Sequence, residues 1–242
     1  MKALLNALKN RKTLIFIDFE GTQFSHEIIA SGLVKCHIDQ DGNILDYDKE
    51  GLLLYTRPIS SIGKIVTNMT SLTEEFIKAN GLSWGDTIEA ISNYVGEEIN
   101  DCLFVCFGSN DLKMVTESCR MSHPTNSNVA KAWLADFFDI MTFMSQFIRD
   151  NNGNNYSLVN FLKLFSLEPV GNSHNPLNDA YDLLNLYQAF IKNKDIVFEE
   201  YLKQIKRMRI FPSPIKETIA SLIDGKDVTS EDFKNKVKSY LE

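Results

Sequence analysis

The sequence predicts an α/β fold in which a mixed β-sheet is flanked by helices. Two observations lead to this prediction. The chain up to Thr56 contains apolar, strand-like runs separated by turn residues, and the residues after it alternate helical patterns with a further apolar run. Strands followed by a mixture of strands and helices are typical of α/β and mixed-sheet folds. With 242 residues, 44% of them hydrophobic, the chain has enough apolar material for a sizeable core.

Four apolar runs predict strands: Leu14–Asp18, Ile28–Ile38, Leu52–Thr56 and Leu103–Phe107. An Asp-Gly-Asn turn signal at residues 41–43 separates the second run from the third, and we assign the acidic segment 46–50 to the same connection. Arg57 and Pro58 close the third run. The front of the chain is therefore expected to form an antiparallel meander.

Helical patterns dominate after the third strand. Thr73 is followed by two glutamates, which suits a helix start because acids in the first turn interact favourably with the helix dipole. Asp86 opens a second helix, whose apolar residues recur every three or four positions. Further helices are expected over residues 111–121, 130–150, 158–165 and 176–192. The N-terminal stretch MKALLNALKNRK predicts a short amphipathic helix or a frayed lead-in.

The character of the chain changes after Lys192. The remaining residues are helical in pattern and richly charged, and they include the basic run KQIKRMR at Lys203–Arg209. Such a run could attract a phosphate chain, although a charged helix face is usually only solvated. We therefore predict one domain over residues 1–192 and a helical C-terminal extension over residues 193–242 that packs on it.

Composition limits the class of protein. The net charge of −7 counts against a passive nucleic-acid coat, but it is compatible with an enzyme that recruits cations to carboxylates. No apolar run approaches the roughly 20 residues of a membrane span, so no membrane partner is expected. Four cysteines lack a paired metal-ligand spacing, which favours a reducing, cytoplasmic location. They are Cys36, Cys102, Cys106 and Cys119.

The stretch LIFIDFEGT places two acids at the end of an apolar strand. Residues two apart in a strand point to the same side, so Asp18 and Glu20 present their carboxylates to one face. Like charges that lie close together disfavour ionisation, so such a pair either binds cations or lies in water. Solvated acids at strand ends are common, and this pair is a weak signal by itself.

Two later segments add acids and a histidine. Asp111 follows the strand-like run at Leu103–Phe107, where it could simply be a helix cap or a first-turn acid. In GNSHNPLNDAYDLL, His174 lies in a loop before a helix that carries Asp179 and Asp182, three residues apart on one side. Local hydrogen bonding would explain the histidine. For Asp182 we favour solvation on the helix surface over a role behind the other acids.

Taken together, the order D-x-E, then D, then H-x4-D resembles the DEDDh 3′–5′ exonucleases, the superfamily of RNase T and polymerase proofreading subunits with a ribonuclease H-like fold. The resemblance covers roughly Leu14 to Lys192. EIIASGLVK is similar to the family's E-I-I-x-x-G-x-V second strand, MTSLT to its L-T-G-I-T segment, and FGSNDLK to the Eri-type RNA exonuclease branch. The chain departs from the family at Ser71, where glycine is usual, and at Pro176, where a small residue is common.

The resemblance implies a two-metal hydrolysis of phosphodiester bonds by Mg²⁺ or Mn²⁺, two ions per site. It implies that Asp18 bridges both ions, that Glu20 and Asp179 complete the first site, and that Asp111 serves the second. His174 would be the general base, and residues 1–192 would be the exonuclease domain. The products would be nucleoside 5′-monophosphates.

The implied substrate is single-stranded nucleic acid with a free 3′ end, held near the first-strand loop and the MTSLT segment. Phe24 would stack beside a terminal base, unless it is a core residue. Met69 and Leu72 would make apolar contacts. The full set of substrate residues that the resemblance implies is Gly21, Thr22, Phe24, Met69 and Leu72.

Several alternatives stay open. RNA is slightly favoured as the substrate, but a DNA 3′-end trimming or proofreading activity uses the same motifs. A degenerate member of the fold could act as a non-catalytic adaptor, although all five motif positions match here. A structural or regulatory domain with merely solvated acids would show no response to Mg²⁺ or Mn²⁺. A homodimer or a larger complex is compatible with the sequence, which does not select an oligomeric state.

Overall fold

The computed structural model describes residues 2–172, 174–207 and 210–241. The chain divides into two compact units. Unit 1 comprises Met1–Phe143 and Ser157–Lys192, and unit 2 comprises Met144–Tyr156 and Asn193–Glu242. The segment at 144–156 thus groups with the C-terminal helices rather than with the residues around it. Packing of residues 193–242 on an exonuclease domain of residues 1–192 stays a prediction.

Unit 1 is built on a mixed six-stranded sheet with the order β3-β2-β1-β5-β6, in which β4 also pairs with β2. Strand β2 pairs with β1, β3 and β4 in the antiparallel sense, whereas β5 is parallel to both β1 and β6. The predicted α/β fold with a mixed sheet is confirmed. The strands are β1 (Thr13–Gly21), β2 (Ile28–Ile38), β3 (Ile44–Tyr47), β4 (Leu52–Tyr55), β5 (Cys102–Cys106) and β6 (Phe137–Asp139).

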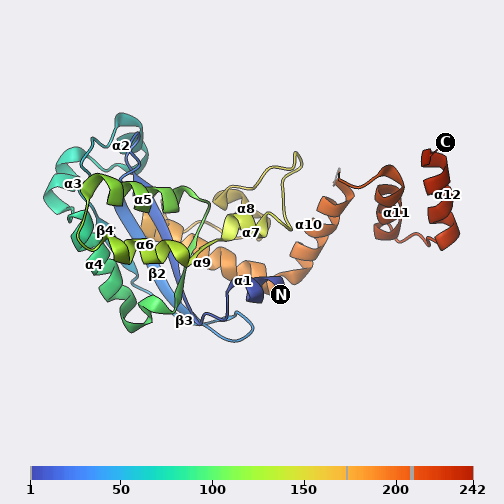
Figure 1. Ribbon diagram of the computed structural model, residues 1–242, viewed down its shortest axis with the longest axis horizontal. Coiled ribbons are helices and arrows are strands. Elements are labelled where there is room, and N and C mark those ends of the chain that lie inside the picture. The colour runs from blue at the N-terminus through green and yellow to red at the C-terminus, as the bar shows by residue number, and fades with distance from the viewer. Residues whose placement is uncertain (1, 173, 208–209, 242) are drawn as a thin grey trace. The chain divides into compact units, whose positions relative to one another are not determined.

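Helices flank this sheet on both faces, with α4, α5 and α6 over one face and α9 over the other (Figure 1). In unit 1 and at its junction with unit 2 the helices are α1 (Lys2–Ala7), α2 (Lys64–Thr70), α3 (Glu74–Asn80), α4 (Trp84–Val95), the 3₁₀ helix η1 (Gly96–Asn100), α5 (Asn110–Ser122), α6 (Ser127–Ala135), α7 (Ile140–Met144), α8 (Leu158–Leu164) and α9 (Pro176–Lys192). Unit 2 contains α10 (Lys194–Arg207), α11 (Ser213–Ile223) and α12 (Ser230–Leu241).

Alternation along β1 separates two cores. Ile15, Ile17 and Phe19 pack in the cluster beneath α4, α5 and α6. Phe16 faces the other way, because its ring lies 5.5 Å from that of Tyr187 on α9. Since strand side chains alternate, Asp18 and Glu20 continue the Phe16 side and lie on the α9 face of the sheet. The placement of α9 therefore decides what surrounds these two acids.

Local sequence signals set several boundaries. The Thr73 hydroxyl accepts a hydrogen bond from the backbone N–H of Phe76, so this residue caps α3 as predicted. Helix α4 begins two residues before Asp86, because Ser83 caps it. Strand β2 and helix α9 have the predicted bounds.

Two predictions about elements were wrong. The acidic segment at 46–50 is not only a connection, because its first two residues belong to β3, an edge strand whose half-buried and exposed side chains leave no apolar run. The predicted helix over residues 130–150 is interrupted by β6, which pairs with β5 in the parallel sense. Three residues are too few to show a periodic pattern. Helix α2 was not predicted either.

The four cysteines are free and buried. Among the helices that the structure describes, none has the length and apolarity to cross a membrane.

Candidate active site

Strand β1 supplies the first two acids of the site. Ile17 and Phe19 are 1% and 5% exposed, so the residues between and beyond them, Asp18 and Glu20, are fixed on the opposite face. Both acids are half-buried. Strand alternation alone therefore directs the two carboxylates to one side, as the sequence predicted.

Asp111 is brought to the same place by β5 and α5. Strand β5 runs parallel to β1 and ends before it, and α5 begins at Asn110. Asp111 is 5% exposed, and its Oδ1 accepts the backbone N–H of Phe19 at 3.1 Å. Because Phe19 lies between Asp18 and Glu20, this bond ties the third acid directly to the strand that carries the first two.

Asp179 is delivered by the first turn of α9, which packs directly on the sheet. A Cβ at Gly32 would lie 2.1 Å from the carbonyl carbon of Pro176, so only glycine permits this approach. Gly32 is also the register partner of Asp18 on the neighbouring strand. The close contact between β2 and α9 thus brings Asp179 to Asp18.

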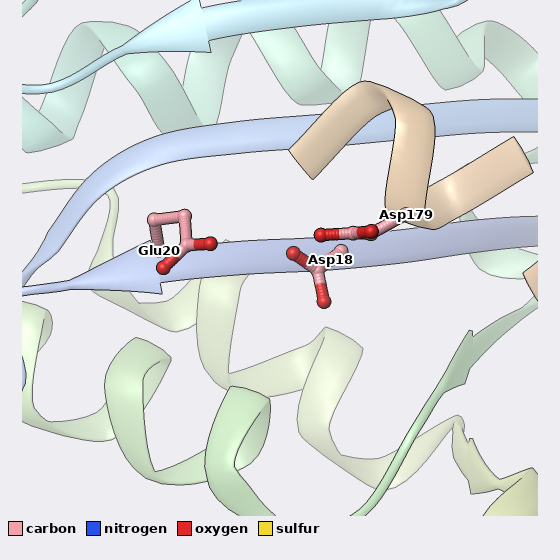
Figure 2. A group of neighbouring side chains, drawn as sticks. All are labelled: Asp18, Glu20 and Asp179. Carbon is pink, nitrogen blue, oxygen red and sulfur yellow. The ribbon is translucent and has the colours of Figure 1, made fainter. Parts of the chain in front are cut away.

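The three carboxylates of Asp18, Glu20 and Asp179 converge. One ligand oxygen from each lies within 4.8 Å of those of the other two. Figure 2 shows the side chains of Asp18 and Glu20 rising from β1 and that of Asp179 reaching down from α9. Residues 18 and 179 are far apart in the chain, so only the tertiary fold assembles this group.

His174 lies at the edge of the group. Its Nδ1 is 3.5 Å from Glu20 Oε1, and its backbone N–H donates to Asp179 Oδ2 at 3.1 Å. The imidazole is 44% exposed, so it is open to solvent and substrate. All five motif residues are therefore brought to one place, with four acids on packed elements and the histidine on a loop.

The electrostatics of the site are those of unneutralised acids. Burial, reinforced by the charges of Asp111, Asp179 and Glu20, raises the pKa of Asp18 well above its usual range. Burial and the charge of Asp179 raise the pKa of Glu20 to about 7. Burial also raises the pKa of Asp111 to about 7, although the N–H of Phe19 opposes the shift. For Asp179 the pKa is raised by burial and by Asp182.

This donor set fits divalent metal ions. Hard cations such as Mg²⁺ and Mn²⁺ prefer carboxylate oxygens. In the described part of the chain, no lysine or arginine forms an ion pair with any of the four acids, which leaves their charge to be compensated from outside. Asp18, Glu20 and Asp179 could share one ion, and Asp111 lines the same cleft.

The acids lie in a cleft of about 430 Å³ with apolar walls. Met69, one of the predicted substrate contacts, lines it and is 50% exposed. Other apolar lining residues were not predicted, since neither their spacing nor their composition marked them. They are Phe107, Met114, Leu158, Val159 and Pro169.

The other predicted substrate residues have different surroundings. Phe24 is 77% exposed, which excludes the core position that the sequence left open for it. Thr22 is buried, and its hydroxyl accepts the N–H of Glu27, so it shapes the loop that presents Phe24. Gly21 is buried against Met114, and Leu72 packs in the small cluster of Ile29, Ile62 and Ile77.

Asp182 corrects the preference stated from the sequence. It is 3% exposed and lines the cleft, so it is not a solvated residue of the helix surface. Its Oδ1 accepts the backbone N–H of Val170 at 2.8 Å. The three-residue spacing from Asp179 could have indicated this position, because both residues lie on one side of α9.

Comparison with solved structures identifies the fold. The nuclease domain of 3'hExo, a DEDDh family member bound to rAMP, superposes with a TM-score of 0.61 at 17% identity, over 76% of this chain and 94% of that one. Cell-death related nuclease 4 (CRN-4) gives a TM-score of 0.60 at 16% identity over 75% of this chain. Exonuclease I from E. coli, in complex with a 5cy-dT13 oligonucleotide, gives 0.57 at 12% identity over 81% of this chain.

These similarities concern the fold. The chain spans 64% of CRN-4 and 43% of Exonuclease I. No protein-family model matches the sequence, and no curated protein does. The predicted ribonuclease H-like fold of the DEDDh exonucleases is therefore confirmed by structure, at identities too low to carry substrate or activity with it.

Proposed function

We propose that this protein is a metal-dependent 3′–5′ exonuclease that hydrolyses phosphodiester bonds at the 3′ end of single-stranded nucleic acid. One observation carries the proposal: carboxylates from β1 and α9 converge within 4.8 Å in a cleft, and no lysine or arginine among the described residues forms an ion pair with them. Similarity of fold to three nucleases supports it. The expected products are nucleoside 5′-monophosphates.

The roles of the acids follow from their placement. Asp18 converges with Glu20 and Asp179, and its chain neighbour Phe19 donates its N–H to Asp111. Asp18 would hold both ions of a pair, with Glu20 and Asp179 on one ion and Asp111 on the other. When bound, a pair of Mg²⁺ or Mn²⁺ ions supplies Lewis-acid stabilisation of the charge that develops on the phosphate and the leaving oxygen.

His174 is proposed as the general base. Its imidazole is accessible, lies beside Glu20 and is attached to a loop, so it can reach a water molecule placed against a bound phosphate. An imidazole is well suited to accepting a proton near neutral pH. The proton of the attacking water would move to His174, and the water oxygen would bond to phosphorus and displace the 3′ oxygen of the penultimate nucleotide. The terminal nucleotide would then leave as its 5′-monophosphate.

The apolar walls of the cleft would accept the terminal nucleotide. Met69 and Phe107 line the same cleft as the acids, and base-to-apolar contacts of this kind tolerate different bases. Phe24 is exposed and available for stacking with a neighbouring base. RNA is slightly favoured as the substrate, and the similar nuclease domain of 3'hExo is bound to rAMP. DNA is the alternative, since the similar Exonuclease I is in complex with a DNA oligonucleotide.

The test is incubation with 3′- and 5′-labelled RNA and DNA oligomers in Mg²⁺, Mn²⁺ or EDTA. Stepwise shortening from the 3′ end is expected with metal and not with EDTA. Asp18→Ala should reduce the rate by at least roughly 100-fold, because the loss of metal support removes several kcal/mol of transition-state stabilisation. A matched control is Asp39→Ala, since Asp39 accepts backbone N–H groups in the turn after β2.

Endonucleolytic products would contradict the proposal, as would cleavage that is indifferent to both Asp18→Ala and His174→Ala. Faster cleavage of the DNA oligomers than of the RNA oligomers would favour the alternative activity, trimming of DNA 3′ ends. Metal-dependent stabilisation without any cleavage would indicate the non-catalytic adaptor.

The buried free cysteines support a reducing, cytoplasmic location for the enzyme.

A further inference from the structure

Asp182 is a buried acid that the proposed mechanism does not use. It lies three residues after Asp179 on α9, is 3% exposed and lines the catalytic cleft. Burying a carboxylate at such a position is costly unless hydrogen bonds compensate for the lost water. The partner is the backbone N–H of Val170, which donates to Asp182 Oδ1 at 2.8 Å.

Val170 belongs to the segment between α8 and α9 that carries His174. Two further side chains of α9 bind backbone groups of the same segment. Asn178 Nδ2 donates to the carbonyl oxygen of Asn172 at 3.3 Å, and Asp179 Oδ2 accepts the N–H of His174 at 3.1 Å. Together with the bond from Val170, these contacts form a clasp, by which we mean the attachment of residues 170, 172 and 174 to residues 182, 178 and 179.

The clasp holds a backbone that would not keep its conformation alone. His174 has φ +63°, in the left-handed region that residues with a Cβ rarely adopt. Such conformations persist only where surrounding interactions fix them. Gly171 has φ +65°, and a Cβ there would lie 2.6 Å from Asn178 Nδ2, so Gly171 lies tightly against the helix.

We propose that Asp182 is a positioning residue for His174: by accepting the N–H of Val170 it holds the segment on α9 so that the imidazole stays beside Glu20. The inference rests on the proposed function, because it takes His174 as the general base. Asp182 would act through its hydrogen bond to the backbone of Val170, and it is not assigned to the metal ions or the substrate. Asn178 is a second, weaker support of the same segment.

Two substitutions separate this role from a charge effect. Asp182→Asn keeps an oxygen that can accept the N–H of Val170, whereas Asp182→Ala removes the acceptor. Asp182→Ala is expected to lower kcat roughly 10- to 100-fold, because a small misplacement of a catalytic group has effects of that size. KM for the oligomer should stay within about threefold, since Met69 and Phe107 are unchanged. The Mg²⁺ midpoint should be similar in Asp182→Ala and Asp182→Asn, because both remove the charge that Asp182 places near Asp179. Asp182→Asn should retain most of the wild-type kcat.

A measurement on the metal-free protein tests the clasp without catalysis. Hydrogen exchange of the peptide that spans residues 166–175 should be at least about tenfold faster in Asp182→Ala than in the wild type. It should be unchanged in Asp182→Asn and in the control Asp39→Ala. Asn178→Ala removes the bond to Asn172 but leaves Asp182 and its hydrogen bond in place. It should give a smaller acceleration of exchange in the same peptide. This variant keeps the test usable if Asp182→Ala folds poorly.

A double-mutant cycle decides whether Asp182 acts through His174. In a His174→Ala background, Asp182→Ala should cost no further activity, because the two changes remove the same contribution. Equal losses with and without His174, unchanged exchange of the 166–175 peptide in Asp182→Ala, or an Asp182→Asn variant as inactive as the alanine variant would each overturn the inference. Full activity of His174→Ala would instead overturn the proposed function, and the exchange measurement on the metal-free protein would still report on the clasp.

Discussion

The buried carboxylates of the site disfavour one another's ionisation. Burial and neighbouring acids raise the pKa values of Glu20 and Asp111 to about 7, from ordinary values of 4.5 and 3.8. The folded chain therefore binds these protons more tightly than the unfolded chain does. Their stabilising contribution is fully present below the ordinary pKa values and is lost as the pH rises through about 7.

Glu20→Gln should remove part of this pH dependence. In EDTA, the wild-type free energy of unfolding is expected to fall between pH 5 and pH 8, and the variant should be more stable than the wild type at pH 8 by about 1–3 kcal/mol. Urea unfolding at the two pH values measures the difference. Glu89→Gln, on the exposed side of α4, is the control. If the free energy of unfolding of Glu20→Gln depended on pH as steeply as that of the wild type, the charge of Glu20 would already be compensated in the folded chain.

Ser71 has a left-handed backbone conformation that lowers the stability of the folded chain. It ends α2 with φ +62° and ψ +10°, and its N–H donates to the carbonyl oxygen of Thr67. Glycine is favoured at such a left-handed position, and the related L-T-G-I-T segment has glycine there. Ser71→Gly should raise the free energy of unfolding by about 0.5–1 kcal/mol, as measured by thermal melting.

The matched variant is Ser71→Val, which should lower the stability by a similar amount, since branched side chains fit this region poorly. Equal melting temperatures for the two variants would argue against strain at Ser71.

Some residues of the site could be predicted from the sequence, and others could not. Asp18, Glu20, Asp111, His174 and Asp179 could be identified because their order and spacing follow a known pattern. The apolar walls of the cleft could not, because a methionine or leucine on a helix has the same local pattern whether it packs in the core or faces a ligand. Only the tertiary fold, which brings residues of α2, α5 and α8 to the same cleft as the acids, makes such residues part of the site.

At the scale of elements, the contact of α9 with β2 is the critical one. Gly32→Ala should force the first turn of α9 away from the sheet, because the new Cβ would lie 2.1 Å from the backbone of Pro176. Asp179 would move with the helix. The expected results are a loss of about 2–3 kcal/mol in urea unfolding and a loss of most of the Mn²⁺-induced rise in melting temperature.

Gly85→Ala is the matched control for this prediction, since the nearest atoms to a Cβ there are 3.5 Å away. It should leave both measurements nearly unchanged. A Gly32→Ala protein with normal stability and a normal response to Mn²⁺ would mean that α9 can shift without cost.

Elements with long periodic patterns were predictable, and short ones were not. The bounds of β2 and α9 follow from runs of apolar residues that turn signals interrupt at both ends. Strands β3 and β6 have four and three residues, and their identity depends on pairing with β2 and β5 rather than on their own sequence. Tertiary pairing of this kind overrides local propensity.

For the whole molecule, the division into units bears on the predicted domain boundary. In unit 2, the ring of Phe147 lies 5.4 Å from that of Tyr201 on α10, and Arg207 donates to Asn151. A chain that ends after Lys192 would lose both contacts. Its melting temperature should be lower than that of the full chain by about 5 °C or more, from the loss of roughly 2 kcal/mol.

A chain that ends after Ile223 keeps α10 and α11 and serves as the control, with a smaller decrease expected. Equal melting temperatures for the chain of residues 1–192 and the full chain would favour the division predicted from the sequence over the two units.

The position of Asp179 on the last helix of unit 1 has a consequence for biosynthesis. A ribosome that has translated the chain only as far as residue 175 has made Asp18, Glu20 and Asp111 but not Asp179, the third member of the convergent group of Asp18, Glu20 and Asp179. Prematurely terminated products therefore lack a full set of ligands. Under the proposed function, hydrolytic capacity would arise only once α9 has been made and has packed on the sheet of unit 1, so shorter fragments of this protein would not cleave nucleic acid.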